Sequence, residues 1–69
     1  MNEKFEIGDV VYDMHELPEW KRHEMVVLNI YSNGTVLCEI FPLTPYGEFK
    51  EKIFYEWNLT KTKYSNLTK

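Results

Sequence analysis

Few side chains in this sequence have the types and the spacing that metal binding or nucleophilic catalysis requires. His15 and His23 are eight residues apart in a polar stretch, and the single cysteine, Cys38, lies inside an apolar run. Structural zinc sites usually take their ligands from pairs at short spacing, and neither Cys-x-x-Cys nor His-x-x-x-His is present. A cysteine within an apolar strand usually behaves as a small buried hydrophobic residue. We therefore expect no metal site, no cofactor and no cysteine nucleophile.

The acidic residues of the first half do not form a pattern typical of an enzyme either. Asp9, Asp13 and Glu16 are close in sequence, but they fall on an expected strand and on the loop after it. General acid–base catalysis needs titratable groups that converge in a cleft. The glycines are isolated turn residues and form no phosphate-binding loop. We expect a protein that is not an enzyme and has no catalytic residues.

The strongest structural signal is a β-hairpin in the middle of the chain. Residues 25–31 and 35–41 are apolar runs rich in β-branched side chains, and Ser32-Asn33-Gly34 joins them. Asn-Gly is the preferred pair for a type I′ turn, whose two positive φ angles match the twist of the flanking strands. The sequence therefore predicts a two-residue turn that places Tyr31 opposite Val36.

In this register each face of the hairpin carries only one polar residue, either Asn29 or Glu39. A hairpin with one face in water alternates apolar and polar side chains, so both faces are expected to be covered. One face would fill the interior of the fold. The other is expected to pack under the long loop before the hairpin, where Leu17 and Trp20 are available, or against a partner protein or a second copy of the chain.

The remaining elements complete a small all-β domain. The chain has 69 residues, and its two Trp, five Tyr and four Phe supply a large buried area for a small core. Short strands, one long first loop and tight later turns predict an SH3-like barrel of about five antiparallel strands. The barrel is expected at residues 1–62, with a polar tail at 63–69; its strands are expected at about 9–14, 25–31, 35–41, 48–55 and within 57–62, with the long loop at 15–24.

Charge and cysteine content restrict the environment and the partners. The net charge is −3, which repels a nucleic-acid backbone. A single cysteine excludes an internal disulfide and favours the reducing cytoplasm. No run approaches the roughly 20 apolar residues of a membrane span, so we expect no membrane association.

A protein or peptide is accordingly the expected partner, with a homodimer as one form of it and nucleic acid as the alternative. Small barrels bind peptides or bases in aromatic grooves. Trp20 and Tyr46 are expected to be exposed because both lie in loops. The candidate partner-binding residues are Tyr12, Trp20, Tyr31, Phe41, Tyr46 and Trp57, and the candidate nucleic-acid-binding residues are Lys21, Arg22, Lys50 and Lys52.

With its strands placed, the chain resembles the YodC-like family of small uncharacterised bacterial proteins over residues 5–60. The resemblance implies an SH3-like barrel and supplies no catalytic residue. Two departures concern loops: the family has a short Gly-Gly-Pro loop where this chain has residues 15–24, and two prolines follow Phe41. The matching pieces, in order, are Phe5-x-Ile7-Gly8-Asp9-Val10-Val11, Met25-x-Val27, Tyr31-Ser32-Asn33-Gly34, Val36-x-Cys38-x-x-Phe41, Tyr46-Gly47, Lys50-Glu51, Phe54 and Glu56-x-x-Leu59.

Overall fold

The computed structural model describes residues 4–64, which form short strands and two single-turn 3₁₀ helices. The strands fall where β-branched and aromatic residues cluster, and the loops between them hold the prolines and glycines. The elements are β1 (Val10–Asp13), η1 (Glu19–Lys21), β2 (Met25–Ile30), β3 (Thr35–Ile40), β4 (Lys50–Tyr55), η2 (Glu56–Asn58) and β5 (Leu59–Thr60).

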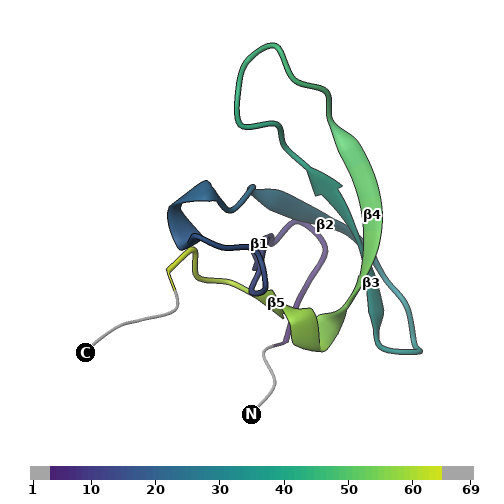
Figure 1. Ribbon diagram of the computed structural model, residues 1–69. Helices are drawn as coiled ribbons and strands as arrows, with labels where there is room; N and C mark the ends of the chain where they lie inside the picture. Colours follow the sequence, from purple (N-terminus) through teal and green to yellow (C-terminus); the bar gives the residue numbers. More distant parts are fainter. Residues whose placement is uncertain (1–3, 65–69) are drawn as a thin grey trace.

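The five strands form an antiparallel sheet in the order β4-β3-β2-β1-β5, which confirms the predicted all-β class and strand number. The sheet curls so that β1 and β5 lie on one side of the curved β2–β3–β4 part (Figure 1). The curled sheet is compatible with the predicted small SH3-like barrel. It is open on one side, because β4 and β5 are the two edges of the strand order.

The turn of the central hairpin differs from the prediction. The N–H of Tyr31 donates to the carbonyl of Thr35 (2.9 Å), and that of Gly34 donates to the carbonyl of Tyr31 (3.3 Å). Gly34 has φ +87°, whereas Asn33, like the other described non-glycine residues, has a negative φ. A type I′ turn needs positive φ at both positions, so the predicted two-residue turn is wrong. The loop has three residues, with glycine in the left-handed position that such loops require.

A β-bulge in β2 adds a second change to the predicted register. Val27 pairs with Cys38 and Asn29 pairs with Leu37, which leaves Leu28 as an extra residue in β2. The wider loop and the bulge each shift the register by one residue. Side chains along a strand alternate with a period of two, so two such shifts cancel in the first half of β2. Met25 and Val27 therefore lie on the same face as Cys38 and Ile40, as predicted.

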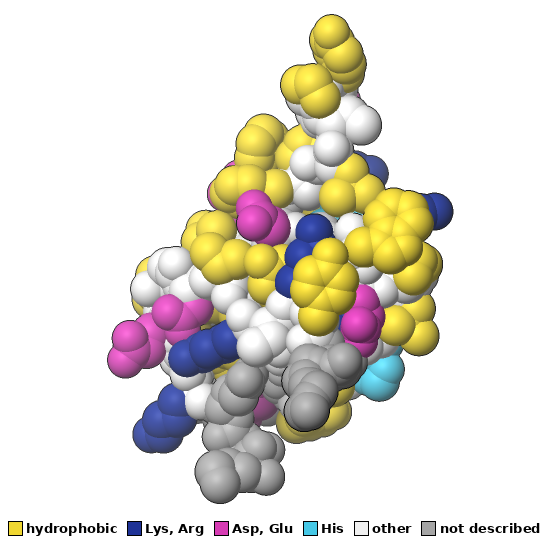
Figure 2. Space-filling model, turned by 90° about the vertical axis from the view of Figure 1, so that its left-hand side faces the viewer, with side chains coloured by type: hydrophobic (Ala, Val, Ile, Leu, Met, Phe, Trp, Pro, Cys, Tyr) yellow, Lys and Arg dark blue, Asp and Glu magenta, His cyan; other side chains and the backbone are white. Residues whose placement is uncertain are grey.

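The first loop lies on the β1 and β5 side of the sheet, where Arg22 holds it in place. Arg22 is only 2% exposed. Its guanidinium donates to the backbone carbonyls of Glu16 (Nε, 3.0 Å), Lys63 (Nη1, 2.9 Å) and Met14 (Nη2, 2.8 Å). The loop is thereby tied to the C-terminal segment. Figure 2 faces this side of the molecule and shows hydrophobic side chains among charged ones.

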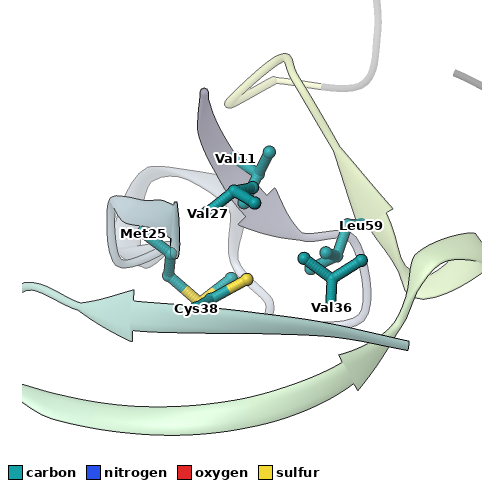
Figure 3. Packing of buried hydrophobic residues seen from close by; sticks show 6 residues of the cluster. All are labelled: Val11, Met25, Val27, Val36, Cys38 and Leu59. Atoms are coloured by element: carbon teal, nitrogen blue, oxygen red, sulfur yellow. The ribbon is translucent and has the colours of Figure 1, made fainter. Parts of the chain in front are cut away.

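The core is small and lies between the curled halves of the sheet. Its buried side chains come from β1, β2, β3 and β5 and point toward one another (Figure 3). Cys38 belongs to this cluster, as expected, and burial raises the pKa of its thiol to about 11. A protonated, enclosed thiol is a poor nucleophile. The cluster consists of Val11, Met25, Val27, Val36, Cys38 and Leu59, and Phe5, Ile40 and Phe54 pack against it.

Candidate protein-binding surface

The face of the β2–β3–β4 sheet that points away from the core carries a group of apolar side chains beside Asn29, Thr35, Glu39 and Glu51. Because side chains alternate along a strand, the positions between the buried residues point outward. Ile53 and Tyr55 of β4 lie on this face and are 56% and 52% exposed. The first loop, β1 and β5 all lie on the opposite side (Figure 1). We call this surface the outer patch; it consists of Val26, Leu28, Leu37, Ile53, Tyr55 and Trp57.

The expectation of one polar residue on each face of the hairpin is wrong, because the bulge places Asn29 on the outer face together with Glu39. The expected cover by the first loop is wrong as well. Leu17 and Trp20 are themselves mainly exposed. The hydrogen bonds of Arg22 hold the loop toward Lys63, on the side of the sheet that carries the core. Ile53, Tyr55 and Trp57 of the outer patch are each more than half exposed.

The aromatic end of the outer patch is built around Tyr55 and Trp57. Their rings stack with centroids 4.7 Å apart and planes 10° from parallel. The N–H of Glu56 donates to the carbonyl of Gly34 (2.9 Å), which brings η2 against the hairpin loop. Tyr31 closes the same loop through Thr35, the residue that pairs with Tyr55. Two of the predicted binding residues, Tyr31 and Trp57, thus lie at one end of this surface.

Tyr55 and Ile53 were missed by the sequence prediction. Their signal lies in the alternation of residues 50–55, Lys-Glu-Lys-Ile-Phe-Tyr. Phe54 pairs with the buried Val36, so the residues on either side of it point outward. Without that pairing, either set of alternating side chains of this strand could have faced the core.

The only charged side chains that strands β2 to β4 place on the outer face are acidic. Glu39 of β3 and Glu51 of β4 are directly paired across the two strands. Like charges in opposed positions of a sheet destabilise it. Lys50 and Lys52, the basic residues of β4, alternate with Glu51 and point to the other face. The outer patch therefore combines apolar area with an unbalanced negative charge.

The other predicted aromatic residues lie elsewhere. Residues 41–49 follow β3, whereas the hairpin loop precedes it, so Phe41 and Tyr46 are at the opposite end of that strand from Tyr31 (Figure 1). Tyr46 is 94% exposed and Trp20 is 62% exposed, as predicted for both. Tyr12 is half-buried on β1, where desolvation and the nearby charge of Glu24 raise its pKa. The six residues do not form one surface.

The predicted basic surface is not formed. Arg22 is buried with its guanidinium donating to backbone carbonyls, so it cannot contact a phosphate. Lys21 lies on η1, with its Nζ 5.3 Å from the centroid of the Trp20 ring. Lys50 and Lys52 lie on β4, across a cleft from acidic side chains of the first loop. A nucleic-acid backbone would meet mixed charge at each of these places.

The described part of the chain holds neither a grouping of metal-ligating side chains nor a membrane-spanning helix. There, no three His, Cys, Asp or Glu side chains are grouped closely enough to hold a metal ion. Within residues 4–64, no helix has the length and the apolar character needed to cross a membrane. The absence of catalytic activity and of cofactors stays a prediction.

No protein-family model, curated protein or solved structure matches this chain. The resemblance to the YodC-like family stays a prediction for that reason. Function is inferred below from the surface alone.

Proposed function

We propose that this protein is a non-enzymatic interaction module whose outer patch binds a partner protein through a segment that carries both apolar and basic side chains. The observation that carries the proposal is the exposed apolar face of β2, β3 and β4, on which Glu39 and Glu51 are the only charges. A buried, single cysteine fits action in the reducing cytoplasm.

The apolar character of the outer patch supports a protein partner. A sheet with one face in water normally places polar side chains at its outward positions, whereas here Val26, Leu37 and Ile53 occupy outward positions beside the polar Asn29, Thr35, Glu39 and Glu51. Removing apolar surface from water stabilises a complex by about 25 cal/mol for each Å². The stacked Tyr55 and Trp57 add the residue types that are enriched at the centres of interfaces.

The paired carboxylates support a basic partner segment. An arginine or lysine placed between Glu39 and Glu51 would replace their mutual repulsion with attraction. A second copy of the same face could not do this. In a symmetric dimer each copy uses the same surface, so four carboxylates would meet within one interface. We therefore propose a different protein, rather than a homodimer, as the occupant.

Nuclear magnetic resonance (NMR) titration tests the proposal with two synthetic twelve-residue peptides of equal apolar content. One peptide carries four lysines and the other carries four glutamates. At low salt, the lysine peptide should shift the backbone amide signals of β3 and β4, with the largest changes around Ile53 and Tyr55. The glutamate peptide should leave them unchanged, since its charge matches that of Glu39 and Glu51.

A charge-neutral variant provides the matched control for this titration. The double change Glu39→Gln and Glu51→Gln should weaken binding of the lysine peptide by about twofold to thirtyfold, because each exposed ion pair contributes roughly 0.2–1 kcal/mol. Glu48→Gln removes an exposed carboxylate from the loop before β4 and should have no effect. Equal binding of both peptides, or shifts away from β3 and β4, would contradict the proposal.

A further inference from the structure

An open cleft of about 420 Å³ lies on the inner side of β4, facing away from the outer patch. It separates β4 from the end of β1 and the first loop. The floor is apolar and is made by Met25, Ile40 and Phe54. Ligand sites in proteins are usually clefts of this size, with an apolar lining and a few polar groups that fix orientation.

Two lysines form the β4 wall of this cleft. Lys50 pairs with Ile40 and Lys52 pairs with the buried Cys38, so both side chains point to the face that carries the core. They meet open space there because β4 is an edge of the strand order. Lys52 places its Nζ 5.2 Å from the centroid of the Phe54 ring. Within residues 4–64, neither ammonium group has an ion-pair partner.

The opposite wall is acidic, but its carboxylates already have partners. One oxygen of Glu16 accepts the backbone N–H of His23 (3.1 Å), and the other lies 2.8 Å from Nδ1 of the same histidine. Asp13 accepts the backbone N–H of His15 (2.9 Å) through Oδ1. Among the charged side chains that line the cleft, Lys50 and Lys52 are therefore the two left without a hydrogen-bond or ion-pair partner in the described part of the chain, and they lie next to an apolar floor.

We propose that this cleft binds a small organic anion, a carboxylate attached to an apolar body. The carboxylate would lie between Lys50 and Lys52, and the apolar body would rest on Met25, Ile40 and Phe54. Asp13 and Glu16 on the facing wall disfavour a polyanion. This site does not depend on the proposed function, because it lies on the other face of the sheet and uses none of the outer patch.

Titration with three matched compounds, followed by the NMR signals of His23 and the β4 amides, tests the proposal. N-acetyl-L-phenylalanine carries the charge and the apolar body, its amide carries the body alone, and acetate carries the charge alone. Only the first compound should bind, with shifts at His23, Lys50 and Lys52. A pentapeptide with a free C-terminal phenylalanine, compared with its amide, shows whether a protein chain end is bound as well as a free acid.

Lys50 and Lys52 could also serve only to protect the β4 edge, since inward-pointing charges keep edge strands from pairing with another chain. Variants of the two lysines separate this role from ligand binding. Replacing both Lys50 and Lys52 with glutamine should weaken the binding of N-acetyl-L-phenylalanine by about twofold to thirtyfold, as expected for two exposed ion pairs. Replacing both with arginine should preserve binding, and Lys21→Gln should not change it. Molar mass measured in parallel shows that each variant stays in the same oligomeric state.

Two results would overturn this proposal. One is binding of the uncharged amide as tightly as the acid, which would make the lysines irrelevant. The other is the absence of any shift at millimolar N-acetyl-L-phenylalanine in a protein that is folded and monodisperse, which would leave the lysines with edge protection as their only role. Neither result bears on the outer patch.

Discussion

Replacing Arg22 with lysine should destabilise the protein strongly, although the positive charge is kept. The guanidinium reaches three carbonyls at different positions, those of Met14, Glu16 and Lys63. A lysine concentrates its donors on one atom, so it can satisfy about one of them. Hydrogen bonds from charged groups contribute about 1.5–3 kcal/mol each, and the loss of two corresponds to about 3–6 kcal/mol.

Water can reach the vacated carbonyls near the surface of the loop, so we expect a loss of about 2–4 kcal/mol in the free energy of unfolding. A chain of this length has a total stability of roughly 3–10 kcal/mol, and the variant should therefore be marginal but measurable at low temperature. Urea unfolding followed by tryptophan fluorescence gives the difference. Hydrogen exchange of the residue 14–23 amides should accelerate in the variant.

Lys21→Met is the matched control, because Lys21 is the exposed neighbour of Arg22 in η1. Its stability should stay within about 0.5 kcal/mol of the parent protein. If Arg22→Lys also changed the free energy of unfolding by less than about 0.5 kcal/mol, the contacts of Arg22 with the three carbonyls would not be what holds the first loop.

Three further predictions concern the core, the hairpin loop and the outer patch. Because burial raises the pKa of Cys38 from 9.0 to about 11, the folded state keeps its proton while the unfolded state loses it. Stability should be full below pH 9 and fall by roughly 2–3 kcal/mol toward pH 11, and Cys38→Val should lose much less over the same range in alkaline urea titrations. Gly34→Ala should cost about 1–2 kcal/mol, since φ is +87° and the added Cβ would make only ordinary contact with Trp57; an unchanged urea midpoint would refute the three-residue loop. Glu51→Gln should raise the free energy of unfolding by about 0.2–1 kcal/mol at low salt, less at high salt, because it removes the repulsion with Glu39; a decrease would mean that the two carboxylates do not repel.

The strand pattern could be predicted from sequence because local signals specify it. Apolar β-branched runs on both sides of Asn33-Gly34 determine a hairpin whatever the turn type. The turn type itself was not determined, because Asn-Gly fits both a two-residue and a three-residue loop. In the structure Asn33 Oδ1 accepts hydrogen bonds from the backbone N–H (3.2 Å) and the hydroxyl (2.6 Å) of Thr35, which stabilises the wider loop.

The sequence indicated the apolar side chains of the outer patch but not that this surface is left uncovered. Counting polar residues on the two hairpin strands predicts few on either face, and it leaves open what covers each face. The answer depends on where the first loop lies, and the contact between Arg22 and Lys63 decides it. The two residues are far apart in sequence, and a contact between a side chain and a carbonyl leaves no periodic signal. For the same reason the sequence indicated Arg22 only as a candidate nucleic-acid-binding residue and gave no sign of its buried contacts.

Site-specific photo-crosslinking in the source organism tests the outer patch as a binding surface most directly. A benzoylphenylalanine replaces Ile53 in one variant and Tyr46, which is exposed in the loop beyond the other end of β3, in a second. The Ile53 variant should crosslink to a different protein, through a segment with lysine or arginine beside apolar residues, and the product should disappear when Glu39 and Glu51 are changed to lysine. Equal crosslinking from Tyr46, a product made of two copies of this chain, or no product from Ile53 would contradict the account.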